Sequence, residues 1–245
     1  MKQSQAKKQD NAMTNKILMG LITLVLGLLF LEILIIHSKN EQQKSASNQV
    51  QTARIMANGD LLYHDGLYMS ALQADGSYDF TENFTYVKPW LKQADLVLGD
   101  FEGTINPDYP LSGYPLFNAP QSVTTAIKDA GYDVMDLAHN HILDSGLEGA
   151  FTTADAFKEV GIDPVGVYEN PVRDKAPLLI KNVNGIKVAI LSYAYGYNGL
   201  ESNLTDKEVA DHLSNLDEKR MKAEIQRAEK EADITVIMPQ MGVEY

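Results

Sequence analysis

The sequence has 245 residues, and 33 Asp and Glu against 21 Lys and Arg give a formal net charge of −12. This acidic balance argues against a nucleic-acid-binding protein, which needs a basic surface to neutralise phosphates. The absence of cysteine from the sequence excludes disulfide bonds, a thiol nucleophile and a thiolate metal site. An apolar content of 44% indicates a globular protein with enough chain to bury a sizeable core.

An apolar segment near the N-terminus predicts one membrane-spanning helix. Residues 17–36 carry a single charge, at Glu32, and twenty helical residues span about 30 Å, the thickness of a bilayer's hydrocarbon core. Lysines are concentrated before this segment, so the positive-inside rule places residues 1–16 in the cytoplasm and the rest outside. A cleaved signal peptide is the alternative, but its apolar region is usually shorter. We therefore expect a single-pass, uncleaved anchor in the cell membrane and an extracytoplasmic main domain.

A polar linker is expected over residues 37–52, which contain no Phe, Leu, Ile or Trp. The domain is then expected over residues 53–245. Its first half contains predicted strands over 53–57 and 96–98, which end at Gly59-Asp60 and Gly99-Asp100, respectively. Predicted helices cover 83–93, where Pro89 is a local flaw, and 122–130, which Gly131 ends.

The second half of the domain continues the alternation of strands and helices. A predicted strand over 134–137 is followed by His139-Asn140-His141, and a predicted helix covers 147–160. Segments 178–183 and 186–191 flank Asn184-Gly185, a strong signal for a two-residue hairpin turn. A charged helix over 217–232, whose charges a solvated face explains, precedes a last strand over 234–238. This order predicts an α/β fold with a largely parallel sheet and one antiparallel pair.

Polar side chains gather where the predicted strands end. In open α/β sheets, ligands bind beyond the carboxyl ends of the strands, so these side chains are expected to converge. Carboxylate, imidazole and amide groups suit Mn²⁺, Fe²⁺, Zn²⁺ or Mg²⁺, and two such ions can promote displacement at phosphorus. The side chains are Asp60 with His64, Asp100 with Glu102, the His139-Asn140-His141 run, and Gln240 with Glu244.

Each of these motifs also has an ordinary structural explanation. Gly-Asp after a strand is often only a turn, His64 can be a surface histidine, and Glu244 can simply be solvated. Tyr193, Tyr195 and Tyr197 alternate along the chain and are expected to place an aromatic face on the core, with a sugar or peptide platform as the alternative. The combination of the clusters, more than any one of them, predicts a metal site.

Five stretches, in this order, resemble the bacterial capsule synthesis protein CapA (PgsA) family, which is linked to poly-γ-glutamate capsules. The resemblance implies a calcineurin-like metallophosphatase fold, an αββα sandwich of two sheets with divalent metal ions at the strand ends. It also implies a membrane-anchored accessory protein of poly-γ-glutamate synthesis or export, with other subunits of the capsule complex as partners. The stretches are NGDLLYHDGLY, YDFTENFTYVKPWLKQADLVLGDFEGTI, GYPLFNAPQSVTTAIKDAGYDVMDLAHNHILDSG, VNGIKVAILSYAYGYNG and VIMPQMGVEY.

The resemblance also implies roles for individual residues. Asp60 resembles the first metal carboxylate, and Glu102 resembles the acidic residue of the second motif, with Asp100 where the family often has Asn. Asn140 resembles a metal ligand. His141 resembles the imidazole that, in related phosphoesterases, assists the leaving group as a general acid.

Two departures from the family pattern bear on function. Many relatives read His-Trp-Gly-x-Glu-Tyr where this chain begins its last motif with Gln240, and an amide is a weaker ligand than imidazole. Family members also continue with further strands and a late His-rich motif, so we expect an incomplete sandwich and a truncated chain. The accessory capsule role is therefore preferred, and an active metal-dependent phosphoesterase acting on a cell-envelope substrate is the alternative.

Overall fold

The computed structural model describes residue 19, residues 27–39 and residues 50–242. The chain divides into two compact units, Met1–Val50 and Gln51–Tyr245. In the first unit, residues 27–39 are helical, whereas most of the remaining predicted membrane segment and most of the predicted linker lie outside the described residues. Within the described ranges, no helix is both long enough and apolar enough to cross a membrane.

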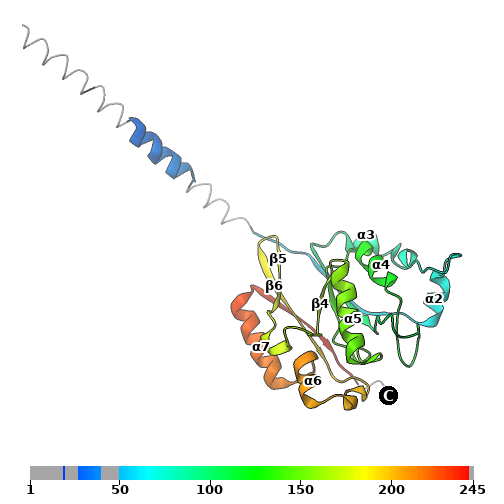
Figure 1. Ribbon diagram of the computed structural model, residues 1–245. Helices are drawn as coiled ribbons and strands as arrows, with labels where there is room; N and C mark the ends of the chain where they lie inside the picture. Colours follow the sequence, from blue (N-terminus) through cyan, green and yellow to red (C-terminus); the bar gives the residue numbers. More distant parts are fainter. Residues whose placement is uncertain (1–18, 20–26, 40–49, 243–245) are drawn as a thin grey trace, which may run out of the picture. The chain divides into compact units, whose positions relative to one another are not determined.

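The second unit contains a four-stranded parallel sheet with the strand order β1-β2-β3-β4 (Figure 1). The prediction of a largely parallel sheet is thereby confirmed. The last strand was not predicted, because it has only three residues and one of them is Pro164, which is tolerated at the edge of a sheet. The strands are β1 (Ile55–Leu62), β2 (Leu96–Glu102), β3 (Val134–Asp136) and β4 (Asp163–Val165).

The first two strands, β1 and β2, are longer than predicted. The sequence places strand ends at Gly59-Asp60 and Gly99-Asp100, but the β1–β2 ladder runs on until Leu62 lies opposite Glu102. The register shifts between Ala57 and Asp60, so an irregularity in β1 accommodates the glycine without ending the strand. Asp60, Asp100 and Glu102 therefore lie within strands instead of in the loops after them.

A second sheet has three strands in the order β5-β6-β7. The predicted hairpin is confirmed, because β5 and β6 pair antiparallel across Asn184-Gly185 and both turn residues have positive φ, 53° and 88°. The last strand pairs parallel with β6. The strands are β5 (Leu179–Val183), β6 (Ile186–Ala194) and β7 (Ile234–Gln240).

The predicted helices of the first half of the domain differ in how well they agree with the structure. The helix predicted over residues 122–130 has those bounds, and Gly131 ends it with a φ of 117°. The continuous helix predicted over 83–93 is wrong: a 3₁₀ turn over Thr81–Phe84 precedes a four-residue helix, with Pro89 in its first turn, where proline is tolerated. The helices are α2 (Asp65–Ala71), α3 (Lys88–Leu91), α4 (Ser122–Ala130), α5 (Gly146–Glu159), α6 (Asp206–His212) and α7 (Glu218–Glu231).

The two sheets pack face to face between two helical layers. Leu96 and Leu98 of β2 belong to a core that includes Val188 and Ile190 of β6, whereas the other face of β2 packs on the core beneath α4 and α5. A third core joins α7 to the outer face of the second sheet. Figure 1 shows α4 and α5 on one side of this unit and α7 on the other.

The alternation of side chains along β2 positions the polar groups. Successive side chains of a strand point to opposite faces, so Asp100 continues the series of Leu96 and Leu98 on the face toward the second sheet. Asp136 of β3 follows Val134 on the same face. The carboxylates therefore lie at the carboxyl end of the first sheet, on its face toward the second sheet.

Candidate functional site

Three carboxylates line one cavity of about 570 Å³ at the carboxyl ends of β1, β2 and β3. Asp60 lies opposite Asp100 in the first ladder, and Asp100 lies opposite Asp136 in the second. Equal register in neighbouring parallel strands therefore places the three side chains in a row. Gln240, the last residue of β7, also lines this cavity, which we call the carboxylate cavity.

The carboxylate cavity concentrates negative charge in a buried position. Asp100 is 8% exposed, and its Oδ1 atom is buried without a hydrogen-bond partner. Burial is the main cause that raises the pKa of Asp100 far above its usual range, and the charges of Asp136 and Asp60 add to it. The described residues that line the cavity include no Lys, Arg or His. A cation from solution would therefore relieve this repulsion.

Hydrogen bonds hold Asp136 in place between the sheets. Ser192 of β6 donates its hydroxyl to Asp136 Oδ1, and the Ala138 N–H donates to the same atom over 2.8 Å. Burial raises the pKa of Asp136, and these two hydrogen bonds oppose the rise. One carboxylate thus connects the end of β3 to the second sheet.

A second polar group, which we call the imidazole cluster, consists of Glu102, His141, Asp144 and Asn198. His141 Nδ1 lies 2.7 Å from Asp144 Oδ2, and His141 Nε2 lies 3.8 Å from Glu102 Oε1. The Asn198 side-chain nitrogen lies 3.4 Å from the same Nε2 atom. His141 is 5% exposed, and contacts at both ring nitrogens fix the orientation of its imidazole in this buried position.

Asp144 is tied to the backbone as well as to the imidazole. Its Oδ2 atom accepts a 2.6 Å hydrogen bond from the Phe117 N–H, and the Phe117 ring packs edge-on against His141 with centroids 4.8 Å apart. Burial raises the pKa of Asp144, and the hydrogen bond with His141 opposes this. The arrangement is a carboxylate that orients a histidine whose second nitrogen faces the other polar groups.

Two amides join the carboxylate cavity to the imidazole cluster. The Asn140 backbone N–H donates to Gln240 Oε1 over 2.9 Å, and Gln240 Nε2 donates back to Asn140 Oδ1 over 2.7 Å. Asn140 Nδ2 donates in turn to Asn198 Oδ1 over 3.2 Å. The side-chain oxygen of Asn140, the atom that a metal would use, therefore already accepts a hydrogen bond from the amide of Gln240.

The residues predicted as a site divide between these two groups. The structure places Asp60 and Asp100 in the carboxylate cavity, and Glu102 and His141 in the imidazole cluster, with Asn140 between them. Across residues 50–242 and the shorter described ranges, no three His, Asp or Glu side chains are grouped so as to hold a metal ion. Oxygen-rich donors and the unpaired Asp100 Oδ1 nevertheless have the chemistry that hard divalent ions require. The ligand and acid roles stay predictions.

Three residues of the site were missed by the sequence reasoning. Asp136 had a signal, because an acidic residue inside an otherwise apolar strand needs a reason to be buried. Asp144 stands three positions after His141, close enough to contact it within one turn. Asn198 gave no signal: it lies in a loop, in the left-handed region with a φ of 55°, and only the folded chain brings it to His141.

The remaining candidate residues have structural roles or lie elsewhere. His64 caps α2, because its Nδ1 accepts the Asp65 N–H over 2.8 Å. Burial lowers the pKa of His139 to about 3, so this side chain is neutral. Tyr193 and Tyr197 are buried as expected, whereas Tyr195 is exposed and lines the carboxylate cavity. Glu244 lies outside the described residues.

The loop that carries Asn140 and His141 needs a glycine beside it. Gly166 follows β4 with a φ of 104°, and a Cβ atom there would lie 2.7 Å from the Ala138 backbone nitrogen. Gly166→Ala is therefore expected to lower the free energy of unfolding by about 2–4 kcal/mol, because the backbone must move to relieve the clash. Urea denaturation of the purified chain measures this loss.

A matched control separates the clash from the backbone strain. Gly161 also has a positive φ, 77°, but a Cβ atom there would meet nothing within 4 Å. Gly161→Ala is expected to cost only about 1 kcal/mol from the strained φ. If both variants lost the same free energy of unfolding, the close approach to Ala138 would not contribute to stability.

Comparison with solved structures supports the fold. A structure described as a putative 5′-nucleotidase from Staphylococcus aureus in complex with alpha-ketoglutarate superimposes with a TM-score of 0.50. The alignment covers 78% of this chain and 38% of that chain at 14% sequence identity. At this identity the likeness concerns the arrangement of strands and helices alone.

Comparison with curated sequences identifies the family. Capsule biosynthesis protein CapA of Bacillus anthracis is 32% identical over 171 residues, which cover 66% of this chain and 41% of the relative. PGA biosynthesis protein CapA of Bacillus subtilis (strain 168) is 26% identical over 241 residues, 97% of this chain and 61% of the relative. The chain thus spans less than two thirds of the length of either relative. The family model of the bacterial capsule synthesis protein PGA_cap matches residues 54–245, and the chain belongs to this family.

Proposed function

We propose that the chain is a membrane-anchored, extracytoplasmic accessory protein of poly-γ-glutamate capsule biosynthesis or export. The family match over residues 54–245 carries this proposal, because the two relatives are named for capsule and PGA biosynthesis. Anchoring rests on the apolar segment 17–36 and on the lysines before it. The partners are other subunits of a capsule synthesis or export complex.

The domain has a calcineurin-like, metallophosphatase-like architecture in this proposal. Its two sheets between helical layers support this, as does the likeness to the nucleotidase. We propose that a divalent cation binds in the carboxylate cavity at Asp60 and Asp100, which lie opposite each other, since their oxygens would lose their mutual repulsion on binding it. Carboxylate oxygens favour Mg²⁺ or Mn²⁺, although iron and zinc are also compatible.

The net charge bears on how the domain serves the capsule pathway. A chain of charge −12 repels a polyanion such as poly-γ-glutamate unless bound metal or a local basic group offsets the charge. Contact with partner subunits therefore explains an accessory role better than direct binding of the polymer does.

Complementation in the native bacterium tests the accessory role. Deletion of the gene is expected to lower cell-associated poly-γ-glutamate, and re-expression of the full chain to restore it. A chain without residues 1–36 should fail to restore the polymer although it is produced, because the anchor is lost. An unchanged polymer level in the deletion strain would contradict the proposal.

A second candidate function, a metal-dependent phosphoesterase acting on a cell-envelope substrate, is favoured by the His141–Asp144 pair. A divalent ion bound nearby would polarise a phosphoryl oxygen and lower the pKa of a bound water. Asp144 holds the imidazole of His141, whose Nε2 atom can give a proton to a leaving oxygen. Glu102 and Asn198 face the same nitrogen and restrict where that proton can go. Hydrolysis of bis(p-nitrophenyl) phosphate with Mn²⁺ distinguishes an active enzyme from a purely accessory protein.

A further inference from the structure

A second cavity, of about 550 Å³, lies between α7, the β5–β6 hairpin and the segment that follows β4. It shares no lining residue with the carboxylate cavity. Leu178, Leu179 and Leu191 supply apolar surface, and the volume falls in the range of small-molecule sites, about 300–1,000 Å³. Three arginines also line it, so we call it the arginine cavity; they are Arg173, Arg220 and Arg227.

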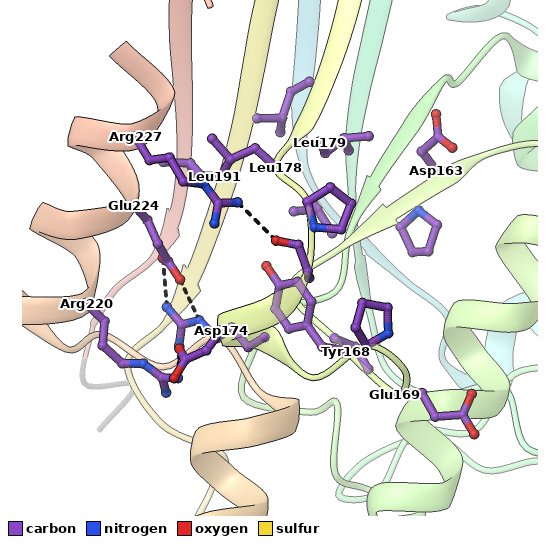
Figure 2. A pocket seen from close by; sticks show the side chains of 18 of the residues that line it. Asp163, Tyr168, Glu169, Asp174, Leu178, Leu179, Leu191, Arg220, Glu224 and Arg227 are labelled. Carbon is purple, nitrogen blue, oxygen red and sulfur yellow. Dashed lines mark hydrogen bonds and ion pairs between the residues drawn. The ribbon is translucent and has the colours of Figure 1, made fainter. Parts of the chain in front are cut away.

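Helical periodicity explains why charged residues face this cavity. Arg220, Glu224 and Arg227 recur at spacings of four and three along α7, which places them on one face of the helix. Met221 and Ile225 occupy another face and pack on the second sheet. The sequence suggested a solvated charged face for this helix, whereas the structure turns one row of charges toward the cavity. Figure 2 shows these side chains projecting from the helix.

Two of the three arginines form close ion pairs with acidic residues of the cavity wall. Arg173, which is 3% exposed, donates to both carboxylate oxygens of Glu224 over 2.9 and 3.0 Å, and Tyr193 donates its hydroxyl to Glu224 over 2.8 Å. Arg220 pairs with Asp174. These bonds connect α7 with β6 and with the segment after β4, so the wall of the cavity is formed before any ligand arrives.

Arg227 is the arginine of this cavity that keeps a spare donor. Its Nη2 donates to the Ala176 carbonyl over 3.0 Å, but its Nε is buried and has no hydrogen-bond partner among the described residues. That Nε also forms a long ion pair with Glu231 Oε1, one turn further along α7, but the separation of 3.7 Å is beyond hydrogen-bond distance. A buried donor without a partner costs free energy that a ligand oxygen would recover.

The acidic residues of the cavity wall do not compete for a ligand. Glu224 is occupied by Arg173 and Tyr193, Asp174 by Arg220, and Asp163 by Lys181 over 2.6 Å. Glu169 is exposed, and in Figure 2 it lies on the far side of the view from Arg227. Arg227 therefore keeps an unused buried donor at this cavity, whose lining also supplies apolar surface.

We propose that the arginine cavity binds a small organic carboxylate with an apolar body. The carboxylate accepts hydrogen bonds from Arg227, including its Nε, in the planar geometry that guanidinium groups offer. The apolar body lies against Leu178, Leu179 and Leu191. This site is independent of the divalent cation and of the capsule role proposed above.

Calorimetric titration with two matched probes tests this site. The full chain is reconstituted in lipid nanodiscs, with empty nanodiscs as the blank and EDTA present, so that no metal in the carboxylate cavity can bind the probe. The probes are 3-phenylpropionate and its uncharged amide, 3-phenylpropionamide. The carboxylate is expected to bind at one site per chain, about tenfold more tightly than the amide, because the amide lacks the charge-assisted contact.

Substitution of the anchor provides the second half of the test. Arg227→Gln is expected to weaken 3-phenylpropionate about tenfold and to change 3-phenylpropionamide by less than about twofold. Lys230→Gln, on the same helix at an exposed position, should leave both affinities unchanged. Thermal unfolding of each variant verifies that it is folded. Absence of saturable binding, equal affinity of the two probes for the wild type, or undiminished binding by Arg227→Gln would each overturn the proposal.

Discussion

Replacement of Asp100 by Asn is expected to stabilise the metal-free chain at pH 8 and to abolish the stabilisation that Mn²⁺ gives the wild type. Burial and the charges of Asp136 and Asp60 raise the pKa of Asp100 in the folded chain, whereas the unfolded chain has an ordinary value of about 3.9. A raised carboxyl pKa means that the folded state prefers the protonated form. Its stabilising effect is therefore complete below about pH 3.9 and is lost as the pH rises toward the folded-state value.

Urea denaturation in EDTA at pH 5 and pH 8 measures this effect. The wild type is expected to lose about 1–3 kcal/mol more than Asp100→Asn between these two pH values. Addition of Mn²⁺ at pH 8 should raise the free energy of unfolding of the wild type but not that of Asp100→Asn, because a bound cation stabilises the folded state by mass action. Asp155→Asn, at an exposed position of α5, is the control and should behave as the wild type. Equal stabilisation of Asp100→Asn by Mn²⁺ would remove Asp100 from the metal site.

Replacement of His141 by Ala is expected to lower kcat for an aryl phosphodiester by about 10²–10⁴-fold if the chain is a phosphoesterase. The loss follows from the position of Nε2, which faces Glu102 and Asn198 while Nδ1 is held by Asp144. Asp144→Asn should lower kcat less, about 10–100-fold, because the imidazole remains but its orientation and tautomer are no longer fixed.

The choice of leaving group makes this experiment specific for proton donation. A p-nitrophenyl ester leaves easily without a proton, whereas a phenyl ester needs one. The loss in His141→Ala should therefore be at least about tenfold larger for the phenyl ester. A loss independent of the leaving group would mean that His141 only shapes the site. A wild type without activity on either ester would leave the accessory function as the remaining proposal.

Local signals in the sequence predicted much of the fold. Asn184-Gly185 strongly favours a two-residue hairpin turn, so the hairpin and its flanking strands were predicted correctly. The amphipathic pattern over residues 122–130, ended by Gly131, gave the correct bounds of α4. Period-two and period-3.6 patterns depend on neighbours within a few residues, which is why these elements could be derived without tertiary information.

Short elements and the composition of the site could not be derived in this way. Helices α2 and α6 have seven residues each, too few for a periodic pattern to stand out, although α6 begins with a capping box at Thr205 and Glu208. Whether a predicted residue belongs to the carboxylate cavity or to the imidazole cluster depends on the side-chain directions where β2 and β3 end. It also depends on Gln240, a partner from β7. Gln240 and Asn140 are 100 positions apart in the sequence, and no local pattern indicates that their amides pair.

The amide pair between Asn140 and Gln240 gives the site a defined place in folding. It joins the loop after β3 of the first sheet to β7 of the second sheet, across 100 positions of the sequence. Closing this segment costs conformational entropy, which is offset only when the contacts between its ends form late in folding. The imidazole and the carboxylates are therefore expected to reach their final positions only after β7 has docked. The Asn140 N–H donates to Gln240 Oε1, so its hydrogen–deuterium exchange is expected to speed up when the two sheets separate at the site.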